Sequence, residues 1–147
     1  MSGWDGAAQA DGTPRPRTER YAMEWMRRRR RLDVAAGIAR IELLCAPSVW
    51  ASLLTRCARR YGTAHFANGL QQPAGAGLVR VELSGLELAE LMDVAARRGR
   101  WWSLEDPPGR ALCRSVYQAA AASIDQLGPV EADTAVPPIT LTAGARS

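Results

Sequence analysis

The chain has 147 residues and is 47% hydrophobic by composition, which suits one domain of ordinary size with further segments at its ends. This length excludes a multidomain enzyme and leaves little room for a complete dinucleotide-binding fold. No apolar run approaches the roughly 18 residues of a membrane-spanning helix, and the start of the chain lacks the apolar stretch of a secretory signal. Three cysteines without paired spacing indicate a reducing compartment, so we expect a cytoplasmic protein.

Charge is concentrated in one segment of the chain. All 19 basic residues are arginine, a bias that indicates a GC-rich bacterial genome rather than a need for guanidinium chemistry. Codon bias does not decide where the charge lies. Residues 15–31 carry eight arginines and two glutamates, a net charge of +6 within a chain total of +4, so the rest sums to −2. The basic character therefore belongs to this segment.

The N-terminal part of the chain separates into a tail and a basic helix. Residues 1–17 are rich in Gly, Pro, Asp and Ala, which predicts a disordered tail. A basic helical segment is expected over residues 18–32, starting near Thr18, with Tyr21 and Trp25 sharing one helix face. Near its C-terminal end lies the arginine run, which consists of Arg27, Arg28, Arg29, Arg30 and Arg31.

An internal repeat organises the central region. Residues 37–43 and 77–83 both read Gly-x-x-Arg-x-Glu-Leu with apolar residues between the charges, and this alternation predicts two β-strands. A helical pattern follows each copy, and each pattern ends in an arginine pair and a glycine. Further strands are expected at 63–67 and 100–104, although the second stretch can also be read as a loop over 100–106.

These elements predict a single α/β domain over residues 33–128. Two strand–helix units would form a small ferredoxin-like βαββα(β) sandwich, and an amphipathic helix beginning at Asp106–Pro107 would follow. Residues 129–147 are expected to be a disordered, solvated tail. Within it, residues 139–141 could instead pair as an edge strand or bind a partner.

Catalytic and metal-binding signals are weak. The three cysteines and His65 lack the spacing of a metal site, and Cys57 lies on the apolar stripe of its helix. No nucleophile elbow or phosphate cradle accompanies His65, and Ser84 with Glu87 is better explained as a helix capping box. We therefore expect no cofactor, no metal and no catalysis, with a small enzyme using His65 as a remote alternative.

Two regions are candidate binding sites. Trp101 and Trp102, beside Arg97, Arg98 and Arg100, could stack on a planar ligand or contact an anion, whereas in the structural alternative one tryptophan faces the core and the other covers a surface gap. The arginine run can bind nucleic-acid phosphates, contact a membrane surface or an acidic partner, or remain a solvated run of charge.

These observations favour a small non-catalytic accessory or regulatory protein. Its basic segment would bind DNA or RNA non-specifically through phosphate contacts. The alternative is a protein–protein interaction module with no role in nucleic-acid binding.

Overall fold

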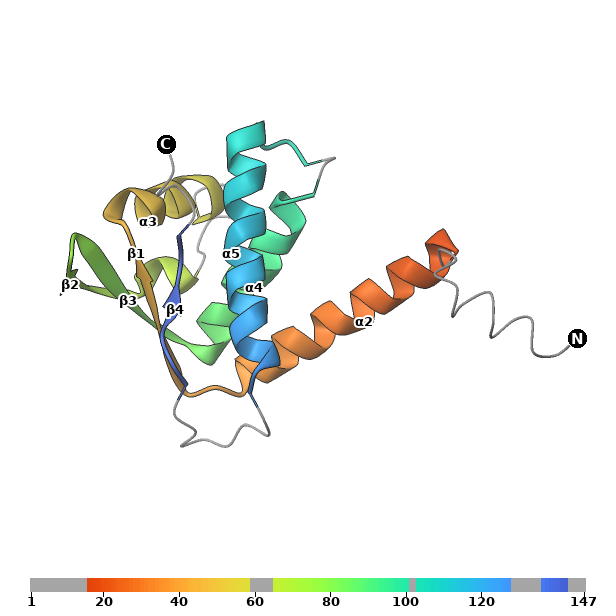
Figure 1. The fold of residues 1–147 in the computed structure, drawn as a ribbon, viewed down its shortest axis with the longest axis horizontal. Coiled ribbons are helices and arrows are strands. Elements are labelled where there is room, and N and C mark those ends of the chain that lie inside the picture. Colours follow the sequence, from red (N-terminus) through yellow and green to blue (C-terminus); the bar gives the residue numbers. More distant parts are fainter. Residues whose placement is uncertain (1–15, 59–64, 101–102, 128–135, 143–147) are drawn as a thin grey trace, which may run out of the picture. The chain divides into compact units, whose positions relative to one another are not determined.

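The computed structural model describes residues 16–58, 65–100, 103–127 and 136–142 (Figure 1). These residues form a mixed α+β structure with four α-helices and a four-stranded open sheet. The chain divides into two compact units, Met1–Arg30 and Arg31–Ser147. No helix in the described ranges combines the length and the apolar character that crossing a bilayer requires.

The first helix, α2 (Arg17–Ala36), is built from residues that favour helical backbone. Arginine, glutamate, methionine and alanine dominate it, and Glu19 places a negative charge in the first turn. The helix ends at Gly37, whose N–H donates to the carbonyl oxygens of Asp33 and Val34 at 3.3 and 3.1 Å. It extends four residues beyond the segment 18–32, so the arginine run is followed by another turn of helix instead of ending it.

The two copies of the repeat pair with each other in the sheet. Strand β1 (Arg40–Cys45) runs antiparallel to β3 (Leu78–Ser84), and Glu42 lies opposite Glu82. Because these glutamates occupy the same place in the repeat, the two strands are related by an approximate twofold axis between them. A single sequence motif therefore supplies both central strands.

Burial alternates along both strands, as the period-2 pattern predicts. One face is packed into the core through Ile41, Leu43, Val81 and Leu83, each 1% exposed or less. The other face carries the charges of the repeat. Arg40 pairs with Glu82 at 3.0 Å, and the equivalent Arg80 lies 3.1 Å from Glu42. The motif thus forms the same cross-strand ion pair twice.

The strand order in the sheet is β2-β3-β1-β4. Strand β2 (Leu70–Gly75) forms a hairpin with β3, and the turn uses positive φ angles at Gly75, Ala76 and Gly77. Pro73 lies within β2, where the pairing register shifts between Pro73 and Gly75. Residues 71–77 are rich in Gln, Gly and Pro, which predicts a loop that joins the two copies of the repeat, and the structure instead places most of these residues in β2 and its turn.

The described residues between β1 and β2 are mainly helical. It contains α3 (Pro47–Leu53), a π-helical turn (Leu54–Ala58) and a 3₁₀ turn (His65–Asn68). The strand predicted over 63–67 is wrong in its described part, because residues 65–67 belong to the 3₁₀ turn. Trp50, Leu53 and Cys57 are buried, so the predicted apolar stripe does face the core.

Two consecutive helices follow β3 and lie side by side on the same face of the sheet (Figure 1). Helix α4 (Gly85–Arg98) begins with the predicted capping box, in which Ser84 and Glu87 exchange backbone–side-chain hydrogen bonds of 2.8 and 3.1 Å. Helix α5 (Pro107–Asp125) is capped by Asp106, which accepts from the Gly109 N–H at 2.8 Å. Both starts agree with the sequence prediction.

Between α4 and α5 the structure gives no support to the strand predicted over 100–104. Arg100 and residues 103–105 form bends, and Trp101 and Trp102 lie outside the described residues. Because α5 reverses the chain a second time after β3, the last strand β4 (Ile139–Thr140) runs parallel to β1. Residues 139–141 therefore join the sheet, and their interpretation as part of a solvated tail is wrong.

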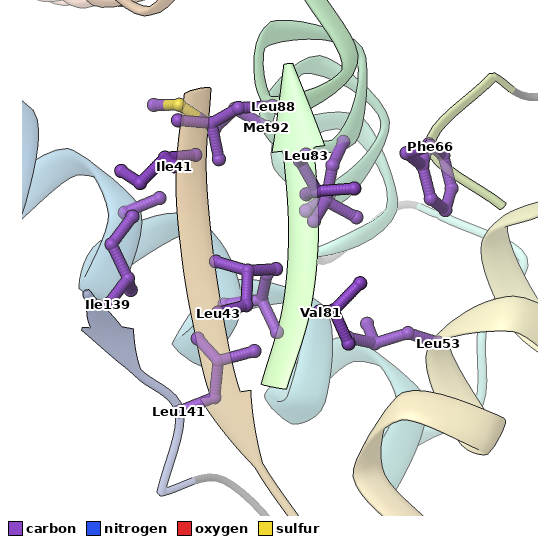
Figure 2. Packing of buried hydrophobic residues seen from close by; sticks show 14 of the residues in the cluster. Ile41, Leu43, Leu53, Phe66, Val81, Leu83, Leu88, Met92, Ile139 and Leu141 are labelled. Atoms are coloured by element: carbon purple, nitrogen blue, oxygen red, sulfur yellow. The ribbon is translucent and has the colours of Figure 1, made fainter. Parts of the chain in front are cut away.

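The core lies between the sheet and the helices. Figure 2 shows Ile41 and Leu43 beside Val81 and Leu83, with Leu88 and Met92 of α4 nearby. Leu53, Phe66, Ile139 and Leu141 extend the same cluster from the flanking segments (Figure 2). Full burial of one such side chain contributes about 1.5–3 kcal/mol, so this cluster is the main source of stability.

Candidate nucleic-acid interface

The arginine run is divided between the two structural units. Arg27, Arg28, Arg29 and Arg30 belong to the first unit, whereas Arg31 belongs to the second. Three of the first four are exposed and Arg28 is partly exposed. Residues 17–30 of α2 contain six arginines and two glutamates, a net charge of +4. Adjacent like charges repel, and a bound polyanion removes that repulsion.

Large side chains are exposed on the same part of α2. Tyr21 is 60% exposed, Trp25 54% and Met26 64%. The guanidinium of Arg29 lies over the Trp25 ring, 5.5 Å from its centroid, in a cation–π contact between residues one turn apart. Cations and aromatic rings are therefore interleaved on α2.

Arg31 is engaged within the second unit. Its Nη2 and Nε donate to the two carboxylate oxygens of Asp125 on α5, at 2.6 and 3.0 Å. Nη1 donates to the Tyr117 hydroxyl at 3.3 Å, and the guanidinium lies 5.9 Å from the Tyr117 ring centroid. The hydrogen bond to Asp125 raises the pKa of Arg31 above its ordinary value. Arg31 thus attaches the end of α2 to α5.

The second candidate region, around Trp101 and Trp102, contains salt-bridged arginines. Arg97 lies 2.6 Å from Asp93 on α4, and the side chain of Arg98 is 5% exposed and bonded to Glu105. Arg100 is exposed. Arg98 is therefore buried in an ion pair with Glu105 and does not face solvent. Both tryptophans lie outside the described residues.

Arg98 belongs to an ionic network between α4 and α5, in which its own pair with Glu105 is buried. Glu105, with a side chain 8% exposed, also accepts from Arg56 at 3.0 Å, and Arg56 reaches Asp106 at 2.9 Å. The Gly109 N–H and the Arg56 guanidinium hold the pKa of Asp106 below its usual range. The network links the end of α4 to the start of α5, which is a structural role.

His65 and the cysteines lie in different surroundings. His65 is exposed in the 3₁₀ turn, where its Nδ1 lies 3.3 Å from a Glu90 oxygen. Cys57 and Cys113 are buried with their sulfur atoms 4.0 Å apart. The two thiols form a hydrogen bond. This hydrogen bond and burial raise the pKa of Cys57, so the Cys57 thiol stays protonated. Within the described ranges, no three His, Cys, Asp or Glu residues are grouped in a way that could hold a metal ion.

Comparison with models of protein families, with curated proteins and with solved structures finds no match. Sequence reasoning identified the arginine run but treated its five members alike, because Asp125 lies 94 residues from Arg31. The exposure of Tyr21 and Met26 also required the structure, since apolar residues on a helix usually mark its buried face.

Proposed function

We propose that this chain is a non-catalytic accessory or regulatory protein of bacterial origin that binds nucleic acid non-specifically through α2. The observation that carries the proposal is the group of adjacent exposed or partly exposed arginines at 27–30, within a segment of net charge +4. Each phosphate that they neutralise releases condensed counterions. Arg31 is bonded to Asp125 and Tyr117 within the second unit and is not counted among these arginines.

Fluorescence anisotropy with labelled DNA and RNA at several salt concentrations tests the proposal. Four phosphate contacts to duplex DNA give a slope of about −3 to −4 for the logarithm of the binding constant against the logarithm of the salt concentration. Affinity should depend little on sequence, because phosphate contacts carry no sequence information. Changing residues 27–30 to glutamine, which keeps helix propensity, should remove most of the binding and of the slope.

A control variant removes two charges elsewhere. Arg40 and Arg80 are paired with Glu82 and Glu42 on the sheet, so Arg40→Gln with Arg80→Gln should leave the slope unchanged. Equal losses in the two variants would point to overall charge rather than to a site. Absence of binding below about 0.1 mM at low salt would overturn the proposal.

A protein–protein interaction module is the second candidate, and the exposed Tyr21, Trp25 and Met26 favour it. Binding to a protein partner would depend less on salt and would persist in the presence of competitor nucleic acid. An enzyme that uses His65 is the third candidate. If His65→Ala abolished a measured activity without a change in stability, the non-catalytic assignment would have to be withdrawn.

The fold and the cellular location belong to the same proposal. We infer a variant of the ferredoxin-like doubled unit, which the strand order β2-β3-β1-β4 and the repeated motif on β1 and β3 support. The additional helix α5, which makes β4 parallel to β1, is the departure from two strand–helix–strand units. Three buried cysteines without a disulfide support a cytoplasmic location.

A further inference from the structure

Two aromatic rings form one face of α2 in the first unit. At 3.6 residues per turn, Tyr21 and Trp25 point about 40° apart and lie about 6 Å apart along the helix axis. Both side chains are more than half exposed. Exposure of two large rings on the same helix face carries a solvation cost, and a ligand that covers them would remove it.

Arginines flank this aromatic face. Arg28 lies about 20° from Tyr21 around the helix, and Arg29 lies about 40° from Trp25 and contacts its ring. Arg27 and Arg30 point about 140–160° away from the midpoint of the two rings. The helix therefore has a face with rings and cations together, whereas Arg27 and Arg30 lie on the opposite face, away from both rings.

This arrangement matches a single strand better than a duplex. A duplex presents its phosphates but holds its bases in a stack, whereas a single strand offers base faces that aromatic side chains can cover. We propose that α2 binds single-stranded nucleic acid, with bases stacked on Tyr21 and Trp25 and phosphates held by Arg28 and Arg29. This inference rests on the proposed function and specifies its ligand.

The composition of α2 favours this ligand over a bilayer. Residues 17–30 contain no leucine, isoleucine, valine or phenylalanine, and the charged Glu24 lies one turn from Tyr21 on the helix surface. A helix that lies in a membrane interface needs a continuous apolar face. Base stacking needs only separate rings with cations beside them.

The test compares a labelled oligodeoxythymidine strand with a duplex of equal length, using the full chain in fluorescence anisotropy. The unmodified protein should bind the single strand more tightly. Tyr21→Ala with Trp25→Ala should weaken single-strand binding about tenfold or more, while duplex binding and the salt slope stay close to their original values. Circular dichroism and urea unfolding should show an unchanged fold, because both side chains are exposed.

Two variants of equal charge test which face of α2 is used. Arg28→Gln with Arg29→Gln should weaken single-strand binding more than Arg27→Gln with Arg30→Gln. Equal binding of both nucleic acids and no effect of the aromatic substitutions would overturn this inference and leave the proposed function standing. Absence of binding to either nucleic acid, with retention on vesicles of anionic phospholipid, would overturn both.

Discussion

Neighbouring arginines in α2 have different roles because their surroundings differ. Arg30 is exposed and belongs to the first unit, whereas Arg31 is bonded to Asp125 and Tyr117 in the second. A bidentate pair that also contacts an aromatic ring holds its geometry better than an ordinary surface pair. At the scale of single residues, stability and the proposed binding can therefore be tested separately within the arginine run.

We expect Arg31→Ala to lower the free energy of unfolding by about 1 kcal/mol, because it removes the ion pair and the ring contact together. Arg30→Ala should leave that free energy within about 0.5 kcal/mol of its original value and should instead weaken nucleic-acid binding. Urea unfolding of the two variants, followed by circular dichroism, measures the difference. Equal free energies of unfolding for the two variants would show that the contacts of Arg31 with Asp125 and Tyr117 do not stabilise the fold.

The buried Cys45 thiol should make stability depend on pH. Burial raises the pKa of Cys45, so the folded protein keeps this thiol protonated where the unfolded chain begins to lose the proton. The unfolded state then binds fewer protons, and the free energy of unfolding falls as the pH rises above about 8.5. Denaturant titrations between about pH 7 and pH 10 should show this decline, and Cys45→Ala should reduce it. An identical pH profile for the variant would contradict the prediction.

At the scale of elements, the pairing of β1 with β3 relates equivalent residues by symmetry. Ile41 and Val81 occupy the same place in the repeat and face the same core. Ile41→Ala and Val81→Ala should therefore lower the free energy of unfolding by similar amounts, about 2–4 kcal/mol each. Arg40→Ala, on the opposite face of β1, is the control and should cost less than about 1 kcal/mol. Chemical denaturation measures all three, and a loss below 0.5 kcal/mol at both core positions would contradict the register.

Local signals in the sequence predicted several elements well. The capping box at Ser84 and Glu87 and the cap at Asp106 involve residues three apart, so a single turn contains the whole interaction. In β1 and β3, apolar and charged residues alternate along the repeated motif, and every buried residue is apolar. The arginine run was equally visible because charge density can be read without a fold.

Elements that depend on distant partners could not be predicted in this way. Strand β2 contains Pro73 and polar residues, and it forms a strand because β3 lies beside it. Strand β4 has only two residues, and its partners Leu43 and Leu44 lie far from it in the sequence. Likewise, no local pattern around Arg31 predicts that Asp125, 94 residues away, is its partner.

At the scale of the whole molecule, β4 connects the C-terminal segment to the core. Ile139 is 2% exposed and Leu141 4%, and the Leu141 N–H donates to the Leu44 carbonyl oxygen at 2.8 Å. Ile139→Ala should lower the free energy of unfolding by about 2–4 kcal/mol. Thr140→Ala, on the exposed side, should change it by less than about 0.5 kcal/mol. Thermal or urea unfolding measures both, and a neutral Ile139→Ala would show that this segment adds nothing to the core.

The proline in β2 also has a consequence for how molecules meet at high concentration. Strand β2 lies at the edge of the sheet, where an exposed ladder of backbone groups can recruit a strand from another molecule. Pro73 has no N–H to offer such a strand, and the register shift beside it bends the edge. Growth of the sheet from one molecule to the next is therefore blocked on this side, which protects the folded protein against edge-to-edge aggregation.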